Sequence, residues 1–342
     1  MSVRTWISII TLGLIALVVF LARGELMRAW ELFAQVDLWI LSLSIPIIAI
    51  SLFATGEMMF SYLRAKGSIV HLKPHQLIRL SLELNFVNHV VPSGGVSGLS
   101  YMGWRLTKLG VSPGRAAMAQ LVRYAAQFGS FIGLLVLAVF IVTLDGNLNR
   151  WIILTSSGLV TTIAVAGLGL MYILSSRRRI AAFARWAAGV INKFVRKVTF
   201  GRKAHTISYI KLDKFFEDLH KDYKNIKREK HLLTKPLWWG VLANLADVAL
   251  FFVAFWSLGQ IANPAPILIA YGLASLSGIV VVTPGGAGAY EAIMVAFLGI
   301  AGISHGVALA GVLLARVILL VVTIGVGYIF YQQSIIKYGR IK

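Results

Sequence analysis

Two arginines lie deep inside long apolar segments of the sequence, where a charged side chain is costly and calls for a specific role. Arg123 follows Arg115 by eight residues and Arg316 follows His305 by eleven. These separations correspond to about 12 Å and about 16 Å along a helix. A guanidinium stays charged in any protein environment and matches a phosphate with two parallel hydrogen bonds. The two arginines are therefore candidate ligands for an anionic, phosphate-bearing group.

Carboxylates and amides inside the apolar segments support a second interpretation. Intramembrane ions normally pair with one another, so the arginines are equally consistent with buried counter-ions that hold helices together. If the arginines bind phosphate, the carboxylates become candidate proton or cation sites that drive transport. The residues concerned are Glu57, Glu83, Asn85, Asn88, Asp247 and Glu291, with Gln120, Gln127 and Asn244 as further hydrogen-bonding groups.

Two motifs rich in proline and glycine, at 92–95 and 283–288, interrupt apolar stretches. Such residues leave backbone groups unpaired, which membrane depth tolerates only inside protein or against a water-filled cavity. Ser93 and Thr283 suit the N-cap position and Pro284 suits the first helical position. Each motif is predicted to present a helix N-terminus, with its partial positive charge, to an anion. The candidate binding residues are Pro92, Ser93, Gly94, Gly95, Thr283, Pro284, Gly285, Gly286, Gly288 and Glu291.

The two motifs match one another at a constant offset of 192 residues, and each precedes a long apolar helix. Glycine in membrane helices often serves only close packing, which is the simpler interpretation of one motif alone. The charge distribution, however, directs the two following helices oppositely across the membrane. Inverted repeats with interrupted helices are typical of transporters whose site lies near the midplane. The matching pairs include Pro92 with Pro284, Gly94 with Gly286, Gly110 with Gly302 and Ala116 with Ala308.

The apolar runs that carry these motifs determine the fold class. A bilayer core about 30 Å thick needs about 20 apolar residues per helix. We predict an all-α polytopic membrane protein with about six full transmembrane helices plus two re-entrant or broken helical hairpins in an inverted repeat. Residues 1–342 form one integral membrane domain, with repeat halves at 38–174 and 237–331. The full spans cover about 6–22, 38–63, 117–143, 151–174, 237–258 and 305–331, and the interrupted stretches cover about 77–103 and 265–303.

The composition agrees with a membrane protein and excludes several classes of site. Hydrophobic residues make up 58% and charged residues 13% of the chain, whereas soluble domains have about 25% charged residues. In so apolar a chain, the formal charge of +20 indicates basic cytosolic loops that contact anionic lipid, rather than a nucleic-acid-binding protein. Without cysteine, disulfides and thiolate metal sites are excluded. Neither His89 nor His305 has a second histidine or cysteine at ligand spacing, and neither a metal nor another cofactor is expected.

Basic residues also predict the orientation of the chain. Seventeen of the 33 lysines and arginines lie between Arg177 and Lys235. The positive-inside rule places this segment and both termini in the cytosol, in a multi-pass protein of the cytoplasmic membrane. Within 177–236, apolar residues recur at helical spacing among the basic ones. This pattern is typical of amphipathic helices that lie on an anionic membrane surface.

Two other functions are consistent with these features. A membrane glycosyltransferase that uses a polyprenyl-phosphate sugar needs a carboxylate at the membrane surface. Glu25, Glu31 and Asp37 lie in the first outer loop, although no Asp-x-Asp sequence and no other catalytic motif occurs. A small-solute or ion transporter would share the inverted repeat. A cavity that opens sideways to lipid favours a lipid substrate, a closed central pocket favours a solute, and an acidic outer pocket favours an enzyme.

The two glycine motifs, with Arg123 and Arg316 downstream, resemble the lysylphosphatidylglycerol synthase transmembrane region, also called the flippase-like domain family. The resemblance covers about residues 6–331 and implies a protein that moves a lipid across the bilayer. In bifunctional members a separate soluble synthetase domain makes that lipid. No such domain is expected here, so a separate lipid-modifying enzyme is an expected partner, and phospholipid, glycolipid, polyprenyl-phosphate and hopanoid pathways all remain open. The lipid phosphate would meet the glycine motifs and the two arginines.

Overall fold

The computed structural model describes residues 3–21, 23–91, 96–144, 150–183, 185–186, 189, 209–280 and 288–338. Within these ranges the regular elements are all helical and no strand occurs, which confirms the all-α fold. The named helices are α1 (Val3–Leu21), α2 (Arg23–Phe33), α3 (Leu38–Ser42), α4 (Ser44–Ala65), α5 (Pro74–Val90), α6 (Val96–Lys108), α7 (Pro113–Leu144), α8 (Arg150–Leu174), α10 (Tyr209–Arg228), η1 (Lys230–Leu233), α11 (Thr234–Ser257), α12 (Pro264–Val280), α13 (Ala289–Ile300) and α14 (His305–Tyr338).

Five segments of the described chain are long and apolar enough to cross a bilayer. They coincide with five of the six predicted full spans, so the chain is a multi-pass membrane protein. The predicted first span, 6–22, coincides with most of α1, a helix of 19 residues. The five segments are Leu38–Ala65, Pro113–Ile141, Ile153–Leu174, Lys230–Ser257 and His305–Tyr338.

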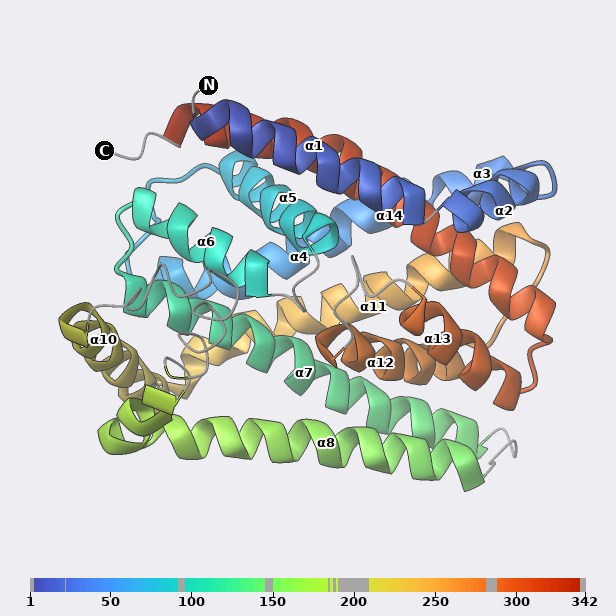
Figure 1. Cartoon of the computed structure of the whole chain (residues 1–342). Coiled ribbons are helices and arrows are strands. Elements are labelled where there is room, and N and C mark those ends of the chain that lie inside the picture. The colour runs from blue at the N-terminus through green and yellow to red at the C-terminus, as the bar shows by residue number, and fades with distance from the viewer. Residues whose placement is uncertain are drawn as a thin grey trace.

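The two interrupted stretches form re-entrant hairpins that open toward opposite ends of the molecule (Figure 1). The α5–α6 hairpin enters from the end where both termini and α10 lie, and the α12–α13 hairpin enters from the other end. The inner ends of both hairpins lie near the middle of the molecule. The long helices follow the same symmetry, because α4 runs opposite to α11, and α7 runs opposite to α14. The predicted inverted repeat is therefore present in the tertiary structure.

The turns that follow the hairpins repeat each other in backbone detail. Gly110 and Gly302 both have positive φ, at 85° and 94°, a conformation that a side chain would strain. The next residues, Val111 and Ile303, each donate a 3.0 Å hydrogen bond to the carbonyl five positions earlier. Each turn then leads into a long helix of 32 or 34 residues, α7 or α14. The offset of 192 residues is therefore a structural equivalence.

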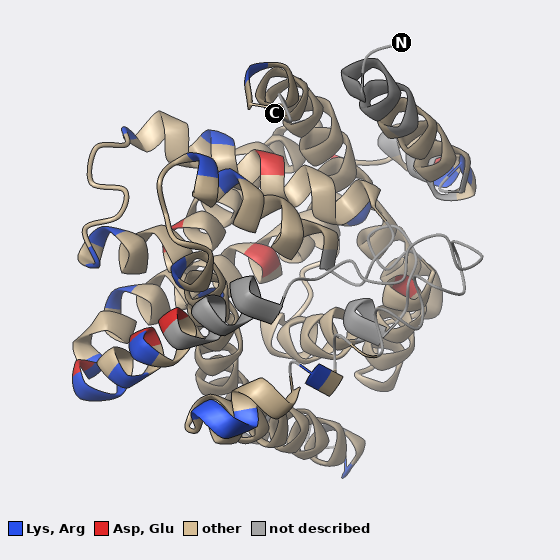
Figure 2. Cartoon of the chain, turned by 60° about the vertical axis from the view of Figure 1, so that its left-hand side comes forward, with Lys and Arg blue, Asp and Glu red and all other residues tan. Residues whose placement is uncertain are grey.

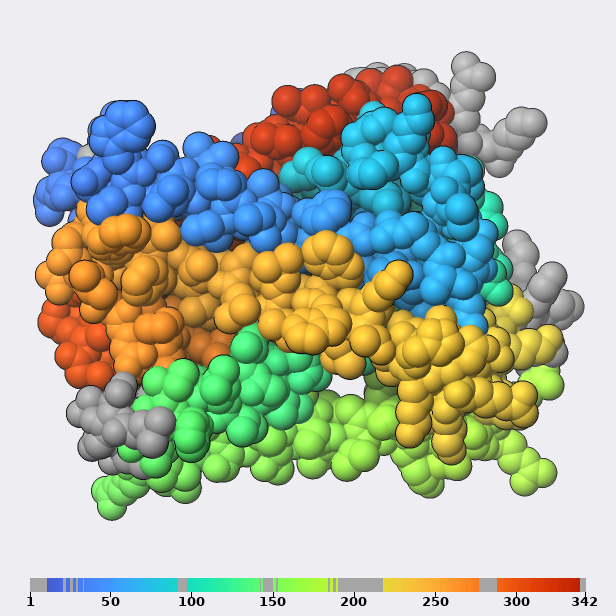
Figure 3. Space-filling model, turned by 180° about the vertical axis from the view of Figure 1, so that it is seen from behind, coloured from blue at the N-terminus to red at the C-terminus, as the bar shows by residue number. Residues whose placement is uncertain are grey.

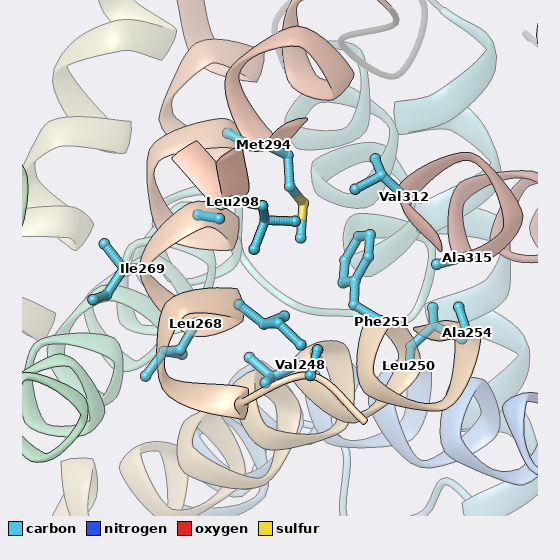
Figure 4. Close-up of a cluster of buried hydrophobic side chains, with 14 of the residues drawn as sticks. Val248, Leu250, Phe251, Ala254, Leu268, Ile269, Met294, Leu298, Val312 and Ala315 are labelled. Atoms are coloured by element: carbon cyan, nitrogen blue, oxygen red, sulfur yellow. The ribbon is translucent and has the colours of Figure 1, made fainter. Parts of the chain in front are cut away.

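Helix α11 contacts α4, α7, α12 and α14, and so joins elements of both repeat halves. Figure 4 shows Phe251 of α11, Met294 of α13 and Val312 of α14 directed into one apolar core. At the α7 contact, a Cβ on Gly240 would lie 2.6 Å from the carbonyl oxygen of Ala126. Some glycines therefore do serve close helix packing, as in other membrane bundles.

Part of the basic segment packs on the protein instead of facing only the membrane surface. Helix α10 lies against α7, and its Leu219 and Asp222 are only 6% and 4% exposed. Asp222 pairs with Arg115 at the start of α7, with N and O atoms 3.5 Å apart. Phe183 and Trp186 are exposed, and their contact with headgroups stays a prediction. Figure 2 shows many lysines and arginines around this end of the molecule.

Candidate functional site

A polar cavity of about 220 Å³ lies where the two repeat halves meet. Its walls come from α4, α5, α7 and α8 of the first half and from α11 and α12 of the second. The large apolar side chains that line it are Phe128, Phe131 and Ile163. The polar groups are Thr55, Asn85, Arg123, Tyr124, Gln127, Asn244, Asp247, Tyr271 and Ser275. The cavity therefore combines five residues singled out by their depth in the sequence with hydroxyl groups that no pattern identified.

Arg123 is the cation of this cavity, and within the described chain it has no ion-pair partner. Its side chain is buried, with 9% of the residue exposed. Its Nε is buried and donates to no acceptor in this part of the chain. The guanidinium lies 4.4 Å from the ring centroid of Tyr124. A buried cation without a counter-charge is unfavourable, so Arg123 remains a candidate ligand for an anion.

Asp247 lines the same cavity from α11 but is held by hydroxyl groups. Its two carboxylate oxygens accept hydrogen bonds from Ser51 at 2.5 Å and from Tyr271 at 2.6 Å. No salt bridge joins Asp247 to Arg123 among the described residues. The cavity thus holds one cationic and one anionic group that do not neutralise each other directly.

The amides predicted as further hydrogen-bonding groups fix the walls of the cavity. Gln127 of α7 donates to the Asn244 side chain of α11 at 2.6 Å. Asn244 donates in return to the Gln127 carbonyl at 3.0 Å and to the Ser130 hydroxyl at 2.9 Å. Asn85 donates to the Ser81 carbonyl one turn earlier in its own helix. The α7–α11 bonds hold the face of α7 that carries Arg123 toward the cavity.

Arg316 fits the interpretation as a buried counter-ion, because it is ion-paired. Its Nε donates to Glu291 at 2.7 Å, and the two residues are only 5% and 6% exposed. The second Glu291 oxygen accepts from the backbone N–H of Gly288 at 2.6 Å, just before α13. Gly288 has φ of 85°. Arg316 also stacks over the Tyr290 ring, 4.3 Å from its centroid. Glu291 and Arg316 therefore fix the start of α13, beside the second break.

Glu83 lies outside the cavity and is fully buried among four donors. Arg79 donates to it at 3.0 Å, Arg105 at 2.8 Å and Tyr101 at 2.9 Å, and Ser334 is the fourth donor. This cluster fastens the α5–α6 hairpin to α14. The spacing of Arg79 to Glu83, one helical turn, is a sequence signal for a pair. No comparable pattern joins Glu83 to the other three residues.

Glu57 and Asn88 also contact neighbouring residues and do not line the cavity. Glu57 forms a two-pronged ion pair with Arg64, two turns later in α4, with one bond of 3.0 Å. Asn88, near the end of α5, packs against Gly98 of α6 so closely that a Cβ there would collide with it. Its Oδ1 is buried without a partner in the described chain. Asn88 thus shapes the first hairpin, whereas the Glu57 pair lies within α4.

The glycine motifs themselves lie largely outside the described residues. This applies to Pro92, Ser93, Gly94, Gly95, Thr283, Pro284, Gly285 and Gly286. Of the second motif, Gly288 and Glu291 are described and bond to each other. The predicted contact between helix N-termini and phosphate therefore stays a prediction.

Of the three predicted surface carboxylates, Asp37 has a structural role. Asp37 caps α3 by accepting from the N–H groups of Trp39 and Ile40 at 2.8 and 3.3 Å. No group of three or more His, Asp or Glu residues that could hold a metal occurs among them. The Asp37 carboxylate therefore serves the start of a helix.

One helix, α8, separates the cavity from the surroundings on one side. Its Ile163 is buried and lines the cavity, whereas Val165 and Leu168 are 63% and 64% exposed. Only 11% of its most apolar window is buried, compared with 50% in α11 and α14. Figure 3 shows a gap between α8 and α11 in the space-filling view. The side of the cavity at α8 therefore borders on lipid.

Comparisons with known proteins agree with a membrane family. The family model of the lysylphosphatidylglycerol synthase transmembrane region matches residues 6–327. A UPF0104 membrane protein of Methanothermobacter thermautotrophicus is 25% identical over 250 residues, which cover 72% of this chain and 70% of that protein. Another, from Methanocaldococcus jannaschii, is 24% identical over 251 residues, covering 71% and 70%. No solved structure matches the chain.

Proposed function

The chain belongs to the family of the lysylphosphatidylglycerol synthase transmembrane region, and we propose that it translocates a lipid with an anionic or phosphate-containing headgroup across the cytoplasmic membrane. One observation carries the proposal. At the junction of two inverted repeats, Arg123 lines a polar cavity with its Nε buried and no anionic partner in the described chain. The headgroup binds there while the acyl chains remain in the bilayer.

The chemistry of the cavity suits a headgroup. The guanidinium of Arg123 presents several N–H donors to phosphate oxygens, and such charge-assisted bonds are stronger than neutral ones. Tyr124 and Ser275 add hydroxyl groups that both donate and accept. Asp247, which also lines the cavity, can accept hydrogen bonds from hydroxyl groups of a headgroup. A polyhydroxylated phosphate ester therefore meets a donor for its phosphate and an acceptor for its hydroxyl groups.

A lipid fits this site better than a free solute. The volume of about 220 Å³ is below the range of roughly 300–1,000 Å³ that is usual for complete small-molecule sites. It holds a headgroup without its chains. The chains would pass the side formed by α8, whose outer face is exposed along most of its length. Rocking of one repeat against the other, the usual consequence of inverted repeats, would expose the cavity to each leaflet in turn.

The orientation and partners follow from charge. The end that holds α10 and both termini faces the cytosol, because the basic residues gather there. The same residues attract anionic headgroups of the cytosolic leaflet. The lipid itself is the product of a separate lipid-modifying enzyme. In this proposal Arg123 binds substrate, and the chain performs no covalent chemistry.

The proposal is tested with Arg123→Ala in vesicles of phosphatidylethanolamine and phosphatidylglycerol that contain a fluorescent phosphatidylglycerol. Quenching from outside measures its exchange between leaflets. Loss of hydrogen bonds to a charged group costs about 1.5–3 kcal/mol, which is about a 10- to 100-fold lower rate. The control is Arg150→Ala, at the exposed start of α8. Exchange by a folded Arg123→Ala protein at the wild-type rate contradicts the proposal.

A further inference from the structure

A second hollow, separate from the polar cavity, lies between α6, α7, α8 and α10. It is a groove of about 620 Å³ at the end of the molecule that carries both termini (Figure 1). Its walls are mostly apolar, in contrast to the cavity at Arg123. The apolar lining includes Leu99, Ala117, Leu121, Leu170, Ile173 and Leu219.

The dimensions of the groove match one acyl chain within one leaflet. Its lining extends from Leu99 to Thr107 on α6 and from Pro113 to Leu121 on α7. Each stretch of nine residues spans about 12 Å along the helix axis, close to half of a hydrocarbon core of about 30 Å. The volume lies within the range of roughly 300–1,000 Å³ for ligand sites. An apolar groove of this length along membrane-spanning helices fits a hydrocarbon chain.

Basic residues stand at the outer rim of the groove. Lys108 directly follows the lining residue Thr107, and Arg178 lies two residues before the lining residue Ile180. Both basic side chains are exposed. Such residues attract the headgroups of anionic lipids. The rim therefore complements a negatively charged headgroup while the groove accommodates a chain.

Gln120 links the inner part of the groove to the polar cavity. The side chain lines the groove and is 3% exposed. Its amide nitrogen donates to the Leu99 carbonyl at 3.0 Å, but its Oε1 is buried without a partner in the described chain. Gln120, Arg123 and Gln127 are spaced by three and four residues, so they share one face of α7. The Gln120 Oε1, which accepts no hydrogen bond in the described chain, thus lies about one helical turn from Arg123.

We infer that this groove binds one acyl chain of an anionic membrane lipid from the leaflet at the basic end, with the headgroup at the rim formed by Lys108 and Arg178. The polar face of α7 then leads the headgroup past Gln120 to Arg123. The inference rests on the proposed function only in taking a membrane lipid as the ligand. Binding in the groove is measurable without translocation.

The test uses the full chain in vesicles of phosphatidylethanolamine and phosphatidylglycerol with a trace of phosphatidylglycerol that carries a diazirine near the end of one acyl chain. After irradiation, mass spectrometry locates the labelled residues. Gly103→Trp fills the groove, because Gly103 lines it and a Cβ there meets no atom within 4 Å. The matched control is Gly167→Trp, on the exposed face of α8, where a Cβ also meets nothing.

The wild-type protein is expected to be labelled mainly within 99–121 and 170–183. Gly103→Trp should lower this labelling several-fold, whereas Gly167→Trp should leave it unchanged. Gly103→Leu, a smaller change, should give an intermediate loss if the tryptophan variant folds poorly. Equal labelling of the groove in Gly103→Trp, or labelling spread evenly over the exposed face of α8, overturns the inference. Crosslinks from residues 190–208 into an unlabelled groove overturn it as well.

Two further measurements test whether the groove prefers a lipid with an anionic headgroup. A diazirine phosphatidylcholine should label the groove several-fold less than the phosphatidylglycerol probe. Lys108→Gln combined with Arg178→Gln should abolish that difference, and equal labelling by both probes in the wild type overturns the anionic preference. Groove labelling without exchange between leaflets contradicts only the proposed function. Exchange without groove labelling contradicts only the groove.

Discussion

Arg316 donates its Nε–H to the buried Glu291 at 2.7 Å, whereas Arg123, in the equivalent helix of the other repeat, has no carboxylate partner in the described chain. At the repeat offset of 192 residues, Arg123 corresponds to Ala315. The arginines are therefore one residue out of register, which is about 100° around a helix. One faces the start of α13, and the other faces the cavity. A shift of one residue in the repeat alignment therefore distinguishes Arg316, which has a structural role, from Arg123, which is a candidate binding residue.

We expect Arg316→Ala to unfold more readily than the wild type, because Glu291 would remain buried without its counter-charge. Breaking such a pair costs about 3–5 kcal/mol. Thermal unfolding in detergent micelles, followed by intrinsic fluorescence, measures the loss. The double variant Glu291→Gln with Arg316→Ala should recover part of it. A double variant no more stable than Arg316→Ala would show that the pair is not coupled.

Glu83→Gln should destabilise the protein far more than Glu57→Gln. Glu83 is fully buried between Arg79 and Arg105, so its neutralisation leaves excess positive charge at a helix junction. The expected cost is about 3–5 kcal/mol. The partner of Glu57 is Arg64, whose side chain is 37% exposed and turns to water, so that loss is about 0–1 kcal/mol. Equal shifts in unfolding temperature would contradict this ranking.

Gly240→Ala should separate α11 from α7, because a Cβ there would lie 2.6 Å from the backbone oxygen of Ala126. Overpacking of this kind costs about 1–3 kcal/mol. The matched control is Gly103→Ala, where a Cβ meets nothing within 4 Å. That control should gain up to about 1 kcal/mol, since alanine is the better helix former. Chemical unfolding of both variants measures the difference, and a stable Gly240→Ala protein would refute the close contact.

Asp247→Asn should strengthen the binding of an anionic headgroup at Arg123, because a negative charge is removed from the shared cavity. Two like charges in one protein cavity repel each other, by about 4 kcal/mol at 4 Å and an effective dielectric constant of about 20 and by less at greater separation. The lipid concentration for half-maximal exchange should therefore fall by up to about tenfold. Glu57→Gln, outside the cavity, serves as the control. A weaker affinity in Asp247→Asn would mean that this carboxylate contacts a cationic part of the headgroup.

The spans could be predicted from the sequence because each is marked by one apolar run. The repeat could be predicted because its two motifs match residue by residue. Helix length follows from apolar runs, and the turns at Gly110 and Gly302 follow from residues that favour a positive φ. The Arg79–Glu83 pair also has a local signal, since the two residues are one turn apart. The cavity hydroxyls of Tyr124, Tyr271 and Ser275 have none, because nothing in their neighbourhood distinguishes them from ordinary helix positions.

By itself, the sequence determined that the chain is a membrane-embedded inverted repeat with two deep arginines. Only the tertiary structure decided that Arg316 is ion-paired with Glu291, that Glu83 joins Arg105 and Ser334, and that α10 packs on α7. The physical reason is that these contacts join residues far apart in the chain. They depend on how each helix is rotated and placed against its neighbours, which the apolar pattern of a single segment does not specify.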